Sequence, residues 1–480
     1  MNKIILIFFL WTTGLSLSFS QSPWSLEKCI QYALDNSLTI RQAEYGVLNA
    51  ALGAQQARAA RLPNVTGQVN GGYQFGRTID PTTNTFENQR IGFNQISLNA
   101  GAVVFNGNRI NNNIKKGKLD LKIAQLQGAE VKNTLSLNIA NAYLAILLTE
   151  EQLDNARKQL VLSNEQLAQT DKLVNAGILP KNNRFDFVSK VALDEQAVIE
   201  FENKLASAYL SLVHLLQLPS SKGFRIEKPE VIIPEPESLP LINPEEVYQI
   251  ALQQQPQIKA AALGVKSADL GVEISKASRI PQLSVFGGLN SNYSTAAKDF
   301  ENPDLSNVTV VENAPQPVVF NGVSGALVTF SPTGIVFPDK KYGTQIRENF
   351  GQNIGLSLSI PIYNNSLSEI NLERSRINVL QQQVVSEQKK QALRTDIQIA
   401  VANARAGAKS YEAAKKSEAA ADVAYQSAIK RYELGTINTF DFSTARNNLD
   451  RARINLIQTK YQYVFYLKII DFYLGKEIKF

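Results

Sequence analysis

The sequence predicts an α+β membrane protein that contains two structural repeats, each built from amphipathic strands and long helices. Three observations lead to this fold class. Motifs recur in the two halves of the chain, four segments alternate apolar and polar residues, and two long segments lack proline and are rich in helix-forming residues. A helix of about 68 residues is roughly 100 Å long, which exceeds an ordinary globular domain.

The first segment, residues 1–20, has the layout of a cleavable secretory signal. It carries Lys3, an apolar run from Ile4 to Leu17, and small residues at Ser18 and Ser20. A membrane-anchoring helix is the alternative, but the run is shorter than the roughly 20 residues that a span needs. We therefore expect the mature chain to begin near Gln21.

Composition excludes several classes of chemistry. The sequence has a single cysteine, Cys29, and a single histidine, His214, so neither an internal disulfide nor a His/Cys metal cluster is expected. We expect Cys29 to be a small helix residue and His214 to have a packed or capping role. The net charge of +6 is modest, and basic and acidic residues are interspersed, which argues against a nucleic-acid partner. No catalytic residue and no cofactor site are predicted.

The two repeats are identified by motifs at fixed offsets. Arg61-Leu62-Pro63 is matched by Arg279-Ile280-Pro281 about 218 positions later, and Gly177 is matched by Gly435 about 258 positions later. The second offset is about 40 positions larger than the first, which predicts an insertion of about 40 residues in the second repeat. We assign residues 21–218 to the first repeat, 244–480 to the second, and the proline-rich stretch 219–243 to a linker around the waist of the molecule, an equatorial region outside the helical layer.

Each repeat is predicted to contain the same elements in the same order. The opening helices are Leu26 to Arg61 and Pro244 to Arg279. The strands are residues 64–76 and 90–106 in the first repeat, and 281–293 and 350–363 in the second, where an inserted loop at 294–349 separates them. Helical hairpins follow at 108–217 and 365–474, with their turns near 177–183 and 435–441.

The strands have one apolar and one polar face. In the last strand Ile354, Leu356 and Leu358 alternate with small or polar residues, whereas Phe286 breaks the pattern in the third strand and the second changes phase between Phe93 and Ile96. Half-buried strands on a soluble core are the alternative. If the strands cross a membrane, four are too few, because the smallest membrane barrels need about eight and an open edge is not tolerated in lipid. Several copies of the chain would then share one barrel.

The first long helix carries a seam of the kind found in supercoiled helices. From Leu135 to Val174, seam residues recur at steps of four and three, and several of them are small or polar, including Ser163 and Thr170. This composition indicates close packing against several neighbouring helices. The returning helix, Asn183 to Leu216, is about half as long as the first, roughly 50 Å. The opening helix is also about half as long, so the opening and returning helices placed end to end match the length of the long helix. Each repeat is therefore predicted to form a helical layer that is two helices wide.

Several motifs resemble those of the TolC family of outer-membrane efflux and secretion ducts. They are SLEKCIQYALDNSLTIRQAE with ARLP, ALQQQPQIKAA with SRIPQLS, FGQNIGLSLSIPIYNN, and the turn motif RYELGTINTFDFSTARNNLDRARINL. The resemblance covers essentially the whole mature chain. It implies a homotrimer in which three copies of four strands form one transmembrane β-barrel, continued by an α-helical barrel that crosses the periplasm. It also implies a periplasmic adaptor and an inner-membrane transporter as partners.

The resemblance places a gate at the periplasmic turns. Gly177 and Gly435 are the turn glycines, Tyr432 stands at a gate tyrosine, and Asp441 stands at a constriction aspartate, where three copies would favour cations. A helix N-cap is the alternative role for Asp441. Asn183, Ile437 and Thr444 depart from the family pattern, and Asp186 lies further from its glycine than expected.

Two other function classes compete with a passive exit duct. A structural coiled-coil protein of the cell envelope would need no lipid-facing strands. A membrane-barrel enzyme would need candidate catalytic residues on the strands, and the sequence shows no nucleotide loop, nucleophile motif or clustered acids there. We therefore expect energy and cargo choice to come from partner proteins.

Overall fold

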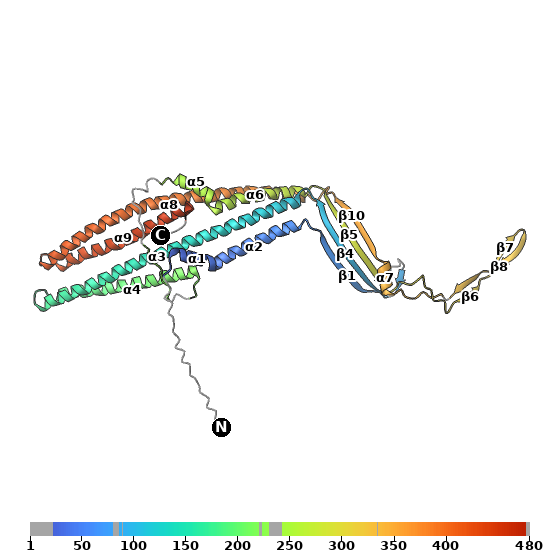
Figure 1. Cartoon of the computed structure of the whole chain (residues 1–480), viewed down its shortest axis with the longest axis horizontal. Helices are drawn as coiled ribbons and strands as arrows, with labels where there is room; N and C mark the ends of the chain where they lie inside the picture. Colours follow the sequence, from blue (N-terminus) through green and yellow to red (C-terminus); the bar gives the residue numbers. More distant parts are fainter. Residues whose placement is uncertain are drawn as a thin grey trace, which may run out of the picture. The chain divides into compact units, whose positions relative to one another are not determined.

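The computed structural model describes residues 23–79, 86–88, 90–219, 223–229, 242–333 and 335–476 (Figure 1). They fall into two compact units. The helical unit comprises the chain up to Gly53, Lys118–Ala268 and the chain from Ile377 onward, and the sheet unit comprises Ala54–Gly117 and Asp269–Arg376. The expected signal at 1–20 lies outside the described residues, as does most of the linker at 219–243.

Two sets of helices of equal length build most of the fold. The first set is α1 (Leu26–Asn36), α2 (Leu38–Ala59), α3 (Arg109–Asn175) and α4 (Asn182–Leu216), and the second is α5 (Pro244–Gln254), α6 (Pro256–Ala277), α8 (Leu367–Glu433) and α9 (Thr439–Tyr473). Both α3 and α8 have 67 residues, and both α4 and α9 have 35. The predicted long helix followed by a half-length returning helix is therefore confirmed in each set.

The prediction of one continuous opening helix per repeat was wrong. The first helix is interrupted at Ser37 and the second at Gln255, both of which have extended backbone angles. At Gln255 the cause is Pro256, because a proline disfavours helical geometry in the residue before it. At Ser37 the preceding Asn36 and the serine itself both favour helix ends. The two helices also stop at Ala59 and Ala277, short of Arg61 and Arg279.

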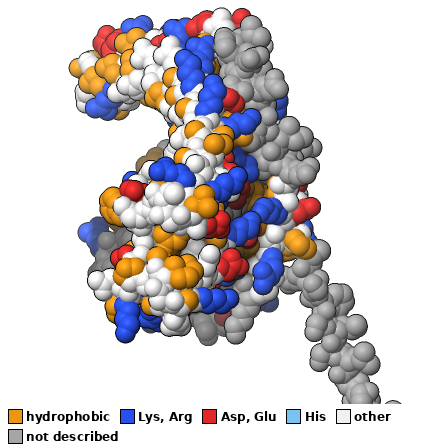
Figure 2. All heavy atoms as spheres, turned by 90° about the vertical axis from the view of Figure 1, so that its left-hand side faces the viewer, with side chains coloured by type: hydrophobic (Ala, Val, Ile, Leu, Met, Phe, Trp, Pro, Cys, Tyr) orange, Lys and Arg blue, Asp and Glu red, His pale blue; other side chains and the backbone are white. Residues whose placement is uncertain are grey.

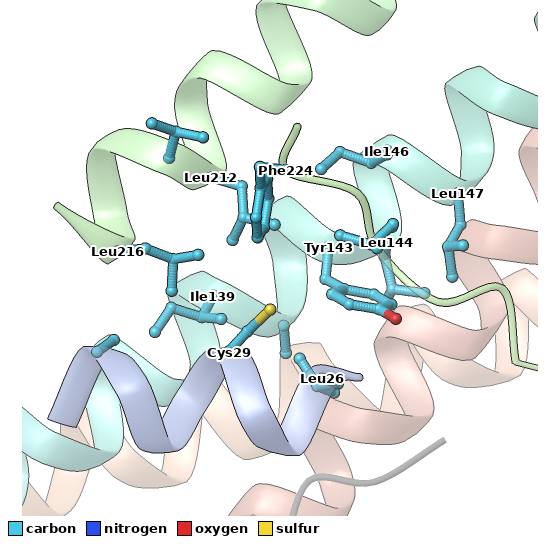
Figure 3. Close-up of a cluster of buried hydrophobic side chains, with 14 of the residues drawn as sticks. Leu26, Cys29, Ile139, Tyr143, Leu144, Ile146, Leu147, Leu212, Leu216 and Phe224 are labelled. Atoms are coloured by element: carbon cyan, nitrogen blue, oxygen red, sulfur yellow. The ribbon is translucent and has the colours of Figure 1, made fainter. Parts of the chain in front are cut away.

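One buried core joins α1 to α3 and α4 (Figure 3). Cys29 of α1 faces Ile139 of α3 and Leu212 and Leu216 of α4, and all four are fully buried. The hydroxyl of Tyr143 lies 2.5 Å from the carbonyl oxygen of Glu227, which ties the segment after α4 to α3. Cys29 is thus the small helix residue that the sequence suggested.

Cys29 is expected to resist thiol reagents in the folded protein. Burial raises the pKa of its thiol to about 12, so almost no reactive thiolate forms at neutral pH. Incubation with a maleimide at about pH 7.5 should leave the native protein unlabelled, whereas the protein unfolded in guanidinium should take up one label. Labelling of the native protein at the rate of a free thiol would contradict this packing.

The packed role predicted for His214 was wrong. Its side chain is exposed, whereas its neighbours Leu212, Val213 and Leu216 are buried on the other side of α4. Only its backbone takes part in the helix end, where its carbonyl accepts a hydrogen bond from the N–H of Gln217.

The sheet unit contains a four-stranded antiparallel sheet in the order β1 (Asn64–Gln74), β4 (Ile91–Phe105), β5 (Gln282–Ser294) and β10 (Gly351–Ser359) (Figure 1). β1 pairs with β4, β4 with β5, and β5 with β10. Strands β1 and β10 form the two edges, and within the described residues neither edge has a further partner.

The pairing places most of the apolar residues of the four strands on one face. Opposite partners such as Val69 and Ile96, or Val285 and Leu356, lie on the same side. This apolar face comprises Val65, Val69, Tyr73, Ile96, Leu98, Ala100, Leu283, Val285, Leu289, Ile354, Leu356 and Leu358. The opposite, polar face comprises Thr66, Gln68, Asn70, Gln95, Ser97, Asn99, Ser284, Asn290, Asn292, Asn353 and Ser357. Ile354 and Leu356 are 87% and 70% exposed in the single chain.

Two phenylalanines explain the apparent breaks in the alternation. Phe93 lies opposite Gly72, and Phe286 lies opposite Gly355, on the polar face. Each ring covers its glycine: a Cβ on Gly72 would lie 3.4 Å from the Phe93 ring, and a Cβ on Gly355 would lie 2.7 Å from the Phe286 ring. The pairing of β4 is regular between Phe93 and Ile96, and its register shifts instead between Val103 and Phe105. The predicted phase change at Phe93 was therefore wrong.

The last strand is shorter than the expected 350–363. β10 ends at Ser359, which pairs with Gln282, the first residue of β5. Pro281 precedes that partner strand, and Pro361 has no N–H to donate, so the ladder stops there. Ile360 and Ile362 remain exposed outside the strand.

The inserted segment is a structured element and differs from the loop that the sequence suggested. It contains two nested antiparallel strand pairs, an inner hairpin of β7 (Gln316–Phe320) with β8 (Val323–Leu327) and an outer pair of β6 (Thr309–Glu312) with β9 (Phe330–Thr333), followed by α7 (Tyr342–Glu348). The buried side chain of Gln345 fixes α7 to the end of β5, because it accepts a hydrogen bond from the N–H of Ser294 and donates one to its carbonyl. In the sequence, a short hairpin of β2 (Arg77–Ile79) with β3 (Phe86–Asn88) connects β1 to β4.

Candidate functional site

The two helical hairpins end in turns of the same construction. Gly177 after α3 and Gly435 after α8 have φ angles of 75° and 70°, which L-residues with a side chain rarely adopt. The N–H of the next residue, Ile178 or Thr436, reaches back to the carbonyl of Leu173 or Arg431, at 2.9 and 2.8 Å. This hydrogen-bond pattern ends a helix and reverses the chain, so both turn glycines have the role that the sequence predicted.

Basic and apolar side chains lie together at the hairpin ends (Figure 2). Near the first turn Ile178 and Phe185 are 67% and 63% exposed, beside the exposed Lys181 and Arg184. At the second turn Leu434 and Phe440 are each 77% exposed. Large apolar side chains that remain this exposed in a single chain favour an interaction surface.

Asn438, and not Asp441, caps the N-terminus of α9. The side-chain oxygen of Asn438 accepts the N–H of Asp441 at 2.8 Å, so Asn438 is the N-cap and the alternative proposed for Asp441 was wrong. Asp441 lies in the first turn of α9 with its side chain exposed. The partial positive charge at a helix N-terminus favours an ionised carboxylate there.

Removing the N-cap should destabilise the second turn. We expect Asn438→Ala to lower the free energy of unfolding by about 1 kcal/mol, the usual cost of losing a cap hydrogen bond. Chemical denaturation of the purified protein, compared with wild type, measures this. Asn447→Ala is the matched control, because Asn447 lies inside α9 and caps no helix end. Equal losses in the two variants would contradict the capping role.

An aromatic cluster joins the two hairpins above their turns. Phe187 of α4, Tyr425 and Tyr432 of α8, and Phe442 of α9 share one buried core. The rings of Tyr432 and Phe442 stack with centroids 4.8 Å apart, and Phe187 lies 6.3 Å from each of them. A cavity of about 150 Å³ lies beside the cluster, lined also by α3. Closer to the turns, Asn183 donates a hydrogen bond to the hydroxyl of Thr439 at 2.9 Å.

A buried arginine lies among three helices next to this cluster. Arg446 of α9 is 2% exposed, and its guanidinium forms an ion pair with Asp194 of α4 at 3.1 Å. It also donates to three groups of α3: the carbonyl of Gln159 at 2.8 Å, the hydroxyl of Ser163 at 2.6 Å, and the side chain of Gln166 at 2.6 Å. The hydroxyl of Ser163 in turn donates to Asp194.

A second acid–base pair extends the network. Lys190 of α4 lies 2.8 Å from Asp194 and 3.5 Å from Asp450 of α9. Burial raises the pKa of Asp450, and the charges of Lys190 and Arg446 oppose that increase. Gln166 donates to the hydroxyl of Tyr425 at 3.0 Å, which brings α8 into the same network. Buried and half-buried side chains thus connect all four helices of the two hairpins.

The structure brings some of the predicted gate residues together and leaves others apart. Asn183 and Tyr432 lie where one hairpin meets the other, and Ile437 packs partly against the aromatic cluster. Asp186 and Asp441 are exposed. The hydroxyl of Thr444 donates to the carbonyl of Phe440 within its own helix, so it forms no bond between hairpins.

Sequence reasoning missed the Arg446 network, although part of its signal was present. Ser163 belongs to the predicted seam of α3, and it is fully buried. Arg446 stands at the same spacing on α9, between the buried Phe442 and Leu449. A charged residue inside such a series indicates a buried ion pair, but the series does not identify the partner on α4.

Other kinds of site are not found in the described ranges. No group of three or more histidine, cysteine or acidic side chains is arranged there to hold a metal ion. Among the same residues no helix combines the length and the apolar character needed to cross a membrane.

The sequence matches the outer membrane efflux protein family. The family's model covers residues 29–216, 247–331 and 344–475. The chain is 26% identical over 282 residues to the pyoverdine export outer membrane protein OpmQ of Pseudomonas aeruginosa, a match that spans 58% of each protein. It is 21% identical to the outer membrane efflux protein BepC of Brucella suis, over 90% of this chain and 81% of BepC.

Solved structures share the fold at low sequence identity. The channel-forming protein CusC superimposes with a TM-score of 0.74 and 18% identity, over 94% of this chain and 92% of its own. The outer membrane protein VceC of Vibrio cholerae gives a TM-score of 0.75 with 14% identity, over 94% of this chain and 96% of its own. The fold is therefore that of outer-membrane channel proteins.

Proposed function

Because the chain belongs to the outer membrane efflux protein family, we propose that it forms a trimeric channel-tunnel of the outer membrane. In this role it is a passive exit duct for an efflux pump or a type I secretion system, and the hairpin ends form its gate. The observation that carries the proposal is the sheet, which has one apolar face, one polar face and two edges without a partner strand among the described residues. Single-channel recording of the purified protein in a planar bilayer is the direct test.

The two faces of the sheet suit a barrel wall in lipid. Residues such as Leu356 and Val285 on the apolar face would contact acyl chains, and residues such as Asn99 and Asn290 on the polar face would line a water-filled lumen. Every backbone group in lipid needs a hydrogen-bond partner. The edges β1 and β10 satisfy this requirement if β10 of one copy pairs with β1 of the next, which closes three copies into one barrel. A coiled-coil envelope protein would have no use for such a sheet.

The helices then form the part of the duct that extends into the periplasm. Helices α3 and α8 are each about 100 Å long. The exposed apolar and basic side chains at the turns are available to a periplasmic adaptor protein, which would connect the duct to an inner-membrane transporter. The chain itself supplies a passage and a gate, and the transporter supplies the energy.

Asp441 is proposed to set the ion preference of the gate. Three copies of this exposed carboxylate around one axis would attract cations and repel anions. We expect Asp441→Asn to reduce the cation-over-anion permeability ratio, measured from reversal potentials in a salt gradient. The matched control is Asp154→Asn, which removes an exposed carboxylate from the middle of α3. An unchanged permeability ratio in the Asp441 variant would show that this carboxylate does not set the ion preference of the channel.

The inserted hairpins are proposed to face the cell exterior and to narrow the pore there. Deleting residues 305–335, with a short Gly-Ser bridge in their place, keeps α7 and its Gln345 contacts to Ser294. We expect the shortened protein to show larger single-channel conductance than wild type. A conductance equal to that of wild type would show that the hairpins leave the pore mouth uncovered.

A further inference from the structure

We propose that the boundary between neighbouring copies repeats the boundary inside each chain, where the first structural repeat meets the second. The proposal rests on the trimeric duct proposed above, and it assigns the strand register and the helix contact at which two copies meet. Ser357 of one copy lies opposite Asn70 of the next, and Asn378 of one copy lies against Asn49 of the next.

The strands of the two repeats correspond residue by residue. Asn64 is the first residue of β1 and pairs with Gly101 of β4, and Gln282 is the first residue of β5 and pairs with Ser359 of β10. Gly101 and Ser359 therefore hold equivalent positions. The sheet order is β1, β4, β5, β10, so the pairing of β4 with β5 is the boundary between the repeats. The pairing of β10 with β1 of the next copy would be its equivalent.

The boundary inside the chain predicts the register between copies. Asn99 of β4 pairs with Gly288 of β5, and their equivalents in the other repeat are Ser357 and Asn70. Both equivalents belong to the polar face of the sheet, so this register keeps polar residues on one side of the shared wall. A shift by a single residue would move every side chain of one strand to the wrong face.

The helical unit carries the same correspondence. Asp120 and Asn378 are the twelfth residues of α3 and α8, and Asn49 and Ser267 are the twelfth residues of α2 and α6. Inside the chain, the hydroxyl of Ser267 donates to the carboxylate of Asp120 at 2.5 Å, which joins α6 of one repeat to α3 of the other. The equivalent contact between copies joins Asn49 to Asn378. Two carboxamides can each donate and accept a hydrogen bond, so the pair is complementary.

The helix surfaces that meet at this boundary are apolar and exposed in the single chain. Beside the asparagine of α2, Leu48 and Leu52 are 59% and 62% exposed. Beside the asparagine of α8, Ile377 and Leu380 are 53% and 60% exposed. A helix face that stays in water normally carries polar residues. Because the two surfaces lie on opposite edges of the same chain arrangement, a second copy supplies the partner for each.

Disulfide formation between copies tests the strand register. Ser357→Cys with Asn70→Cys should give covalent trimers on oxidation, because opposite residues of antiparallel strands have Cα atoms about 4.5–5.5 Å apart, within reach of a disulfide. Each chain then carries one cysteine on each edge of its sheet, so the bonds can join all three copies. Cys29 is buried and does not compete.

Two matched controls keep both cysteines on the polar face but move them two residues out of register. They are Ser357→Cys with Gln68→Cys, and Asn70→Cys with Ser359→Cys. The Cα atoms of such diagonal neighbours are roughly 7–8 Å apart, too far for a disulfide without backbone movement. We expect monomers from both controls on a denaturing gel. Covalent trimers from a control, and none from the first variant, would overturn the proposed register.

A charge exchange tests the helix contact. Asn49→Glu with Asn378→Glu places two carboxylates together at every boundary, and it should lower the temperature at which the trimer dissociates. Asn49→Glu with Asn378→Lys places opposite charges there and should return that temperature to the wild-type value or above it. Equal dissociation temperatures for the two double variants would show that these positions do not meet.

A second strand pair covers the case in which the first cysteine variant does not assemble. Ala100 pairs with Gly287 inside the chain, so Leu358→Cys with Val69→Cys has the same register on the apolar face and should also give covalent trimers. The native mass of wild type in the same detergent separates the two proposals. A monomeric wild type would contradict the trimeric duct. A trimeric wild type without bonds at either predicted pair would contradict the register alone.

Discussion

Replacing Leu356 by arginine should prevent the protein from assembling in the outer membrane, whereas replacing the next residue, Ser357, by arginine should be tolerated. Leu356 lies opposite Val285 on the apolar face, and Ser357 lies opposite Ser284 on the polar face. An arginine that faces lipid near the middle of a membrane barrel costs about 2–4 kcal/mol. Three copies in one trimer would multiply that cost.

The two variants differ only in the face that receives the charge. Both positions belong to β10, and both are exposed in the single chain. On a soluble sheet each arginine would be solvated, and each would change stability by less than about 0.5 kcal/mol. The measurement is the fraction of protein that migrates as a folded trimer after extraction from outer membranes. Equal yields of the two variants would contradict a lipid-facing role for the apolar face.

Replacing Arg446 by alanine should lower the free energy of unfolding far more than removing an exposed charge from α9 does. The change removes from the buried Asp194 carboxylate and the buried Ser163 hydroxyl their charged partner on α9, and it leaves Asp194 paired with Lys190 alone. Breaking one side of a buried ion pair costs about 3–5 kcal/mol. Equilibrium denaturation of the detergent-solubilised protein measures the difference from wild type.

An arginine five positions along the same helix is the matched control. Arg451 is exposed, and Arg451→Ala should change the unfolding free energy by no more than about 0.5 kcal/mol. The paired substitution of Arg446 by methionine and Asp194 by leucine should recover most of the loss, because it removes both buried charges together. Similar losses for Arg446→Ala and Arg451→Ala would show that the network adds nothing to stability.

The strands and long helices were predictable because their signals are local. Alternation at every second residue decides which face of a strand a side chain occupies, and the paired strands keep Leu356, Val285 and Leu98 on one side, as the pattern indicated. The exceptions follow from contacts across strands. Phe93 and Phe286 lie on the polar face because each covers a glycine of the neighbouring strand, and a single strand carries no record of that partner.

The ends of elements were less predictable, for reasons that differ between positions. Pro256 marks the break before α6 and Pro361 marks the end of β10, so both ends have a local signal in the sequence. The hairpin of β7 and β8 had a signal in Asn321-Gly322, which forms its two-residue turn. By contrast, Arg446 takes its partners from helices more than 240 positions away in the sequence, and no local pattern specifies that pairing.

The conductance of the purified mature protein in a planar bilayer, recorded with the native mass of the same sample, tests the proposed duct most directly. A passive, gated duct of three copies should give the mass of a trimer and small, discrete, cation-preferring conductance steps. A monomeric species without conductance would contradict the shared barrel. The apolar face of the sheet would then have to be covered by something other than lipid.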